Sequence, residues 1–138
     1  MPSASSCALP KQVMDAHHHF LDTTTNPEGN GNDFQSFLSS LVQEKYLPSH
    51  YHQDVVQALK EQGVTLVGSV HVECMPDDGP KEAAWVYSLT TAIPSSSTVK
   101  AIVGSCDLTS PTVDEDLVKL KAASPMVRGV GWILDCVG

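Results

Sequence analysis

The 138-residue chain lacks an apolar run that approaches the roughly 20 residues of a membrane-spanning helix. It also has few basic residues: 8 lysines and arginines stand against 16 acidic residues, which gives a formal net charge of −8. A chain of this charge repels a phosphate backbone and an anionic lipid surface. We therefore expect neither nucleic acid nor a membrane as a partner.

Cysteines at the spacing of a metal knuckle or a disulfide framework are also lacking. The four cysteines are scattered, at Cys7, Cys74, Cys106 and Cys136. Their spacing excludes a zinc knuckle and favours reduced thiols in a cytoplasmic protein. The first ten residues have no apolar core, so they do not predict a secretory signal. We expect a disordered tail over residues 1–12 and one domain over residues 13–138.

The apolar residues that are present predict repeated β–α units. Short apolar runs typical of strands cover residues 13–19, 64–72, 99–106 and 127–134, and the second of them predicts a strand buried on both faces. A loop over residues 21–33 follows the first run. Helical stripes cover residues 34–46, 48–62, 81–93 and 110–123. Strands that alternate with helices predict an α/β protein with a parallel sheet.

Single residues mark the expected ends and faces of these helices. Gly63 predicts the end of the helix that Pro48 opens, because glycine tolerates a positive φ. Ser110 is the expected N-cap of the last helix, since proline follows it. The third helix is predicted to bury one stripe, made of Ala84, Trp85, Leu89 and Ile93.

Ionisable residues follow each of the four predicted strands. His17 and His19 project to one face of the first strand, whereas His18 projects to the other. Two imidazoles on one face, two residues apart, can both reach a single cation about 2 Å away. The later strands are followed by further candidates, namely His71, Glu73, Asp107 and Asp135. We interpret this repetition as the mark of an enzyme of the barrel or doubly wound type.

Each candidate also has an interpretation without chemistry. The histidines could form a solvated loop entrance, or one ring could be a hydrogen-bonded core histidine. Glu73 could orient or replace a metal ligand, or it could only cap the loop that follows it. Asp107 could serve a site or start a turn. The sequence leaves these alternatives open.

Five short segments occur in an order and at a spacing that resemble a known family. They are DAHHHF at residues 15–20, YLP at 46–48, VHVE at 70–73, AIVG at 101–104 with DL at 107–108, and VRGV at 127–130. These segments are similar to consecutive blocks of the amidohydrolase-related family, the lactonase-like members of the metal-dependent amidohydrolase superfamily. The resemblance spans residues 14–135.

The resemblance implies the N-terminal half of a TIM-type (β/α)₈ barrel, with its site at the C-terminal ends of the strands. It implies that His17 and His19 hold a divalent metal, zinc in the first instance, or hold the substrate without a metal. From their places after the strands, and not from the resemblance, Glu73 and Asp107 are the candidate catalytic residues and His71 is the candidate substrate contact. The implied reaction is hydrolysis of a lactone or a related cyclic ester or amide. The alternative is a non-catalytic fragment that binds a metal or a partner.

Two departures from the family's pattern change these expectations. Gly131 stands where the family often carries an arginine that would bind a substrate carboxylate, and Arg128 points to the opposite face. The chain is also shorter than a barrel, which takes about 250 residues. We therefore expect the later catalytic residues to be missing and lactone hydrolysis to be slow or absent. The edges at residues 13–19 and 127–134 then predict a homodimer, a larger aggregate or a marginally folded chain, and not a stable monomer.

Overall fold

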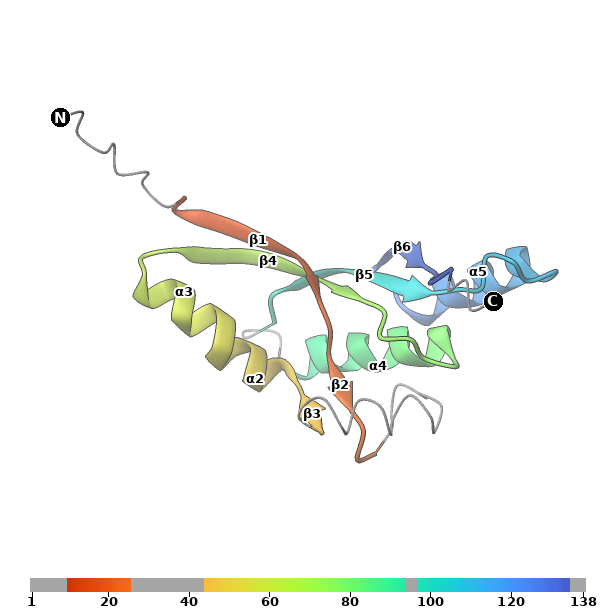
Figure 1. Cartoon of the computed structure of the whole chain (residues 1–138), viewed down its shortest axis with the longest axis horizontal. Helices are drawn as coiled ribbons and strands as arrows, with labels where there is room; N and C mark the ends of the chain where they lie inside the picture. The colour runs from red at the N-terminus through yellow and green to blue at the C-terminus, as the bar shows by residue number, and fades with distance from the viewer. Residues whose placement is uncertain (1–9, 26–43, 94–96, 135–138) are drawn as a thin grey trace.

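A four-stranded parallel sheet forms the centre of the protein (Figure 1). The computed structural model describes residues 10–25, 44–93 and 97–134. Neighbouring strands of the sheet follow the sequence order β1 (Gln12–His18), β4 (Thr65–Val72), β5 (Val99–Ser105) and β6 (Val127–Gly131). The predicted α/β class and the parallel, sequential pairing are therefore confirmed. Residues 1–9, most of the predicted helix over 34–46 and Asp135 lie outside the described residues.

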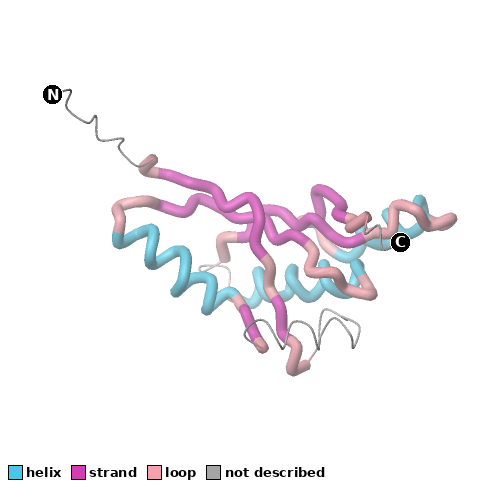
Figure 2. The backbone as a smooth tube through the Cα atoms, in the orientation of Figure 1, coloured by secondary structure: helices cyan, strands magenta, loops and turns pink. Residues whose placement is uncertain are grey.

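The helices pack on one face of this sheet (Figure 2). The chain from β3 (Lys45–Tyr46) to β4 passes through α2 (Pro48–Tyr51), a π-helical segment η1 (His52–Gln57) and α3 (Ala58–Glu61). Helices α4 (Gly79–Ala92) and α5 (Val113–Ala123) follow β4 and β5. The buried core joins α2, α4 and α5 to the strands through Phe20, Tyr51, Ala83, Val86, Val99, Ile102, Cys106 and Leu120. Within the described ranges, no helix covers the opposite face of the sheet. No helix among these residues is both long and apolar enough to cross a membrane.

The second helical segment ends where the sequence predicts. Gly63 has a φ of 73°, and its N–H donates to the carbonyl of Lys60 at 2.9 Å. At the other end, the backbone N–H of Leu47 donates to Nδ1 of His50 at 3.0 Å. Pro48 occupies the first turn, where a missing N–H costs nothing. Both ends of this segment are therefore set by local interactions that the sequence shows.

The predicted buried face of α4 is correct only in part. Trp85 and Leu89 are half-buried against the core, whereas Ala84 and Ile93 are exposed. The fully buried residues of the helix are Gly79, Glu82, Ala83, Val86 and Thr90. Two of these residues are polar, and each has a partner inside the protein. Glu82 accepts from the N–H of Cys74 at 2.8 Å, and the hydroxyl of Thr90 donates to the carbonyl of Tyr87 at 2.7 Å. An apolar stripe cannot reveal a face that contains satisfied polar groups.

Four smaller expectations also differ from the structure. Residues 21–22 and 45–46 do not belong to a loop and a helix: they pair antiparallel as β2 (Leu21–Asp22) and β3 (Lys45–Tyr46). Helix α5 begins at Val113, because the hydroxyl of Ser110 instead accepts from the N–H of Thr112 in a turn. Strand β6 ends at Gly131. Strand β4 is not buried on both faces, since Val67 remains 44% exposed.

Candidate functional site

The candidate site is a pair of imidazoles at the C-terminal end of β1. The Nε2 atoms of His17 and His19 lie 3.3 Å apart, and the two rings meet edge to face. His17 is exposed and His19 is half-buried. Two nitrogen ligands of a tetrahedral zinc ion, with bonds of about 2.0–2.1 Å, lie about 3.3 Å from each other. The separation of the two nitrogens therefore fits two corners of a zinc site.

Hydrogen bonds to neighbouring elements hold both histidines in this arrangement. Nδ1 of His19 lies 2.8 Å from the carbonyl oxygen of Val72, which can only accept, so this nitrogen carries the hydrogen. The lone pair of His19 is then on Nε2, facing His17. The backbone N–H of His17 donates to Oδ1 of Asp15 at 3.0 Å, and the hydroxyl of Tyr51 donates to Oδ2 of the same carboxylate at 2.8 Å. Metal-binding histidines are oriented by partners of this kind.

His18 projects to the opposite, core side of β1, as the alternation of a strand predicts. Its ring packs against Phe20 and Tyr51 with centroids 4.6 Å away from each, and its Nε2 lies 3.0 Å from Oγ of Ser69. Burial and, to a smaller extent, the nearby His71 together lower the pKa of His18 to about 4. A neutral, buried imidazole is suited to a structural role under the exposed pair.

His71 and Glu82 form a buried pair beneath the same strand ends. Nδ1 of His71 accepts the backbone N–H of Phe20 at 3.2 Å, so a neutral ring carries its hydrogen on Nε2, which lies 3.5 Å from Oε1 of Glu82. Burial lowers the pKa of His71 to about 3 and raises that of Glu82 to about 8. Both groups are therefore neutral at pH 7. His71 is fully buried, and its contact with a substrate stays a prediction.

Glu73 and Asp107 both stabilise the loops that follow their strands. Oε2 of Glu73 accepts the N–H of Met75 at 2.7 Å, and Met75 has a positive φ of 51°. Oδ1 of Asp107 accepts both the N–H and the hydroxyl of Thr109, at 2.8 Å and 2.7 Å. The loop-cap and turn alternatives thus have direct structural support. A catalytic role for either carboxylate stays a prediction.

Comparison with known proteins identifies no relative. No protein-family model, no curated protein and no solved structure matches the chain. The geometry of the site is therefore the basis for its chemistry, and the resemblance to the amidohydrolase-related family stays a prediction.

The other sequence candidates do not join the histidine pair. Over residues 10–25, 44–93 and 97–134, no three histidine, cysteine or acidic side chains are grouped to hold a metal ion. Arg128 is exposed and donates to the carbonyl of Pro125 at 2.6 Å, which confirms its predicted surface position. Cys106 belongs to the buried core, where burial raises the pKa of its thiol. His17 and His19 therefore remain the candidate metal ligands, and metal binding by this pair stays a prediction.

Sequence reasoning missed the residues that support the pair. Asp15 and Tyr51 are 36 positions apart, and His18 and Ser69 are 51 apart, so no local pattern connects them. Glu82 was missed because a glutamate in a helix normally predicts a solvent-exposed face. The available signal was its place beside Ala83 and Val86 on a different helical stripe from the one predicted.

Proposed function

We propose that this chain is an amidohydrolase-related hydrolase that acts on a lactone or a related cyclic ester or amide. The observation that carries the proposal is the convergence of Nε2 of His17 and Nε2 of His19, 3.3 Å apart, at the C-terminal end of a parallel strand. Ligands of α/β proteins bind at this end of the strands. The pair lies next to β4, because His19 is held by the carbonyl of Val72.

In this proposal His17 and His19 hold a divalent metal ion, and zinc suits two imidazole ligands. A bound zinc ion would polarise the carbonyl group of the substrate and would lower the pKa of a water molecule bound to the metal. The protein's own contribution is orientation: Val72 directs the lone pair of His19, and Asp15 fixes the backbone of His17. The exposed ring of His17 leaves the site open to a small substrate.

A second candidate function is metal or partner binding without catalysis. It is favoured by the loop contacts that occupy one oxygen of Glu73 and one of Asp107. Zinc binding and hydrolysis are therefore measured separately.

Zinc is expected to bind the wild-type protein at one equivalent, and the double variant His17→Ala/His19→Ala is expected to lose at least about tenfold in affinity. The loss follows from removing both imidazoles that converge on the proposed position. Competition with a chromophoric chelator measures the affinity. Hydrolysis of a panel of simple lactones, with and without zinc, is followed in the same samples. Its rate is expected to be low, because losing a proton-transfer group costs about 10²–10⁴-fold.

The matched control is His52→Ala, which removes a histidine from η1, away from β1. This variant is expected to bind zinc as the wild type does. Equal zinc binding by all three proteins would refute the histidine site. Zinc binding that requires His17 and His19 but brings no lactone turnover would select the binding function over the hydrolase.

We further propose that the four parallel strands and their helices form half of a (β/α)₈ barrel. Its support is a parallel sheet in sequence order with helices packed on one face, which is how successive units of a barrel are arranged. Strands β1 and β6 are the edges of the described sheet. Met14, 56% exposed, lies over Gly68 on the face away from the core. A second copy that pairs its β1 with β6 of the first would close an eight-stranded barrel.

The chain is accordingly expected to self-associate as a dimer, since unpaired strand edges and uncovered apolar side chains favour pairing. Met14→Lys places a charge on the uncovered face and is expected to weaken the dimer at least about tenfold. Sedimentation over a range of concentrations measures this. Val118→Lys is the control, because Val118 is an exposed valine of α5. A wild-type monomer at every concentration would contradict the proposed pairing.

A further inference from the structure

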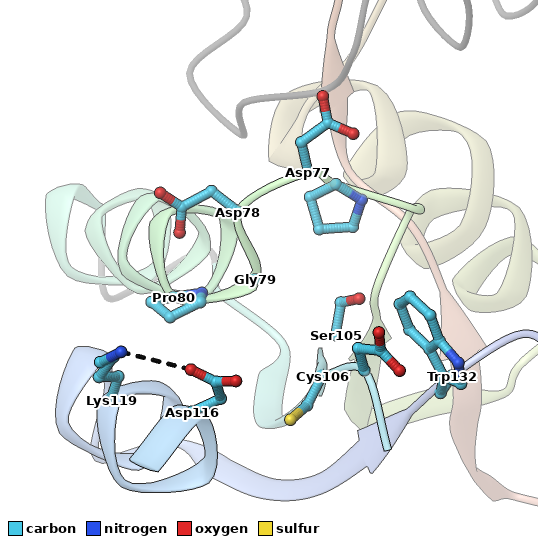
Figure 3. A pocket seen from close by; sticks show the side chains of 11 residues that line it. Asp77, Asp78, Gly79, Pro80, Ser105, Cys106, Asp116, Lys119 and Trp132 are labelled. Atoms are coloured by element: carbon cyan, nitrogen blue, oxygen red, sulfur yellow. Dashed lines mark hydrogen bonds and ion pairs between the residues drawn. The ribbon is translucent and has the colours of Figure 1, made fainter. Parts of the chain in front are cut away.

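A pocket of about 560 Å³ lies beside Trp132, between the C-terminal end of β5 and the N-terminal end of α4 (Figure 3). Asp77, Ser105 and Asp107 line it together with this tryptophan. None of the histidines of the candidate site lines this pocket. The pocket is therefore separate from the histidine pair, although its lining includes Asp107, one of the predicted catalytic residues.

The lining of the pocket carries excess negative charge. Four aspartates face one lysine, and Lys119 is already paired with Asp116 at 3.3 Å. Among the described residues, Asp77 makes neither a hydrogen bond nor an ion pair, and Asp107 uses only Oδ1, which accepts from Thr109. The unused oxygen of Asp107 can therefore neutralise a positive charge in the pocket, whereas Figure 3 shows the carboxylate of Asp77 directed away from Trp132.

A buried hydroxyl also faces this space. Ser105 is only 8% exposed, and its side chain has no hydrogen-bond partner in the described part of the protein. Figure 3 shows its oxygen between the loop that carries Asp77 and the ring of Trp132. Because this hydroxyl lies on the wall of the pocket and is not used by any other described residue, it can exchange a hydrogen bond with a ligand there.

The chemistry of the lining distinguishes an organic cation from a metal ion. The acidic residues are not grouped closely enough to share a metal ion, as far as the described residues show. The ring of Trp132 is 39% exposed at the pocket, and an indole face attracts an ammonium group within about 6 Å. A volume of 560 Å³ accommodates a small molecule.

We infer that this pocket binds a small organic ammonium compound that also carries a hydroxyl group. The ammonium group lies against the ring of Trp132, and the carboxylate of Asp107 balances its charge. The hydroxyl of the ligand pairs with Ser105. Choline has both groups in one small molecule, so it serves as the probe.

The test compares choline with its neutral isostere 3,3-dimethylbutan-1-ol by calorimetry and by tryptophan fluorescence. Saturable binding of choline, at least about tenfold tighter than that of the alcohol, is the expected result. The chain has two tryptophans, and Trp85 lies on α4. A Trp85→Phe background therefore leaves Trp132 as the reporter. No saturable choline binding, or equal binding of the alcohol, would overturn the inference.

Variants assign the binding to the lining residues. Asp107→Asn and Trp132→Leu are each expected to weaken choline binding about threefold or more. Asn at position 107 keeps an oxygen for Thr109, so the turn is retained while the charge is lost. Ser105→Ala is expected to weaken choline but not tetramethylammonium, which has no hydroxyl.

Two control variants test whether the effect is specific to the pocket. Asp114→Asn removes a charge from α5 at a residue that does not line the pocket, and it is expected to leave choline affinity unchanged. The His17→Ala/His19→Ala variant is also expected to bind choline normally, so this test and that of the hydrolase fail independently. An effect of Asp114→Asn equal to that of Asp107→Asn would show general attraction of cations and would refute the pocket.

Discussion

Replacement of Gly79 by alanine is expected to lower the free energy of unfolding by about 3 kcal/mol or more. A methyl group on Gly79 would overlap the carbonyl oxygen of Ser105 and lie 2.9 Å from its carbonyl carbon. Both are backbone atoms of β5, so α4 would have to move away from the sheet. Chemical unfolding in urea measures the change. A loss of this size is a large fraction of the roughly 5–15 kcal/mol typical of a domain.

Gly129→Ala is the matched control for this prediction. Its methyl group would lie 3.6 Å from Cγ2 of Val103, which is an ordinary contact. We expect a change within about 1 kcal/mol, because reduced freedom of the unfolded chain offsets any small adjustment. If Gly79→Ala were as stable as Gly129→Ala, the close approach of α4 to β5 would be incorrect.

The second large effect concerns pH and the buried carboxyl of Glu82. Burial raises its pKa from 4.5 to about 8, so between these values the folded protein holds a proton that the unfolded chain releases. The stabilisation is complete below pH 4.5 and is lost as the pH rises through about 8. The unfolding free energy is therefore expected to fall by roughly 2 kcal/mol from about pH 6.5 to 8. Urea titrations across this range measure it.

The two buried histidines, His18 and His71, affect the free energy of unfolding at acidic pH. The pKa of His71 is lowered to about 3 and that of His18 to about 4, both from 6.5. The unfolded chain therefore binds more protons below pH 6.5, and stability rises with pH up to that value. Together with Glu82, these groups predict a stability maximum near pH 6.5.

Glu82→Gln isolates the alkaline side of this curve. The amide keeps an oxygen for the N–H of Cys74 but cannot ionise, so the decline between about pH 6.5 and 8 is expected to disappear. Glu115→Gln changes an exposed glutamate of α5 and is expected to retain the decline. A variant curve that still falls like the wild type would mean that Glu82 does not carry the proton.

The sequence by itself determined those features that depend on local periodicity and local backbone chemistry. Short apolar runs that alternate with helical stripes predicted the four parallel strands in order. Each run is long enough for one strand, and each connection is long enough for a crossover. The two-residue period of a strand placed His17 and His18 on opposite faces of β1. Gly63 marked a helix end through its own φ.

Only the tertiary structure decided how those elements face one another. The orientation of α4 about its own axis depends on the close contact between Gly79 and the backbone of Ser105, which is 26 positions away in the sequence. This orientation places the carboxyl group of Glu82 next to the ring of His71. The hydrogen bond from His19 to Val72 spans 53 positions. The grouping of Asp77 with Trp132 has the same origin. Contacts between distant segments are set by packing, in which polar groups are buried once they find partners, and no local pattern records those partners.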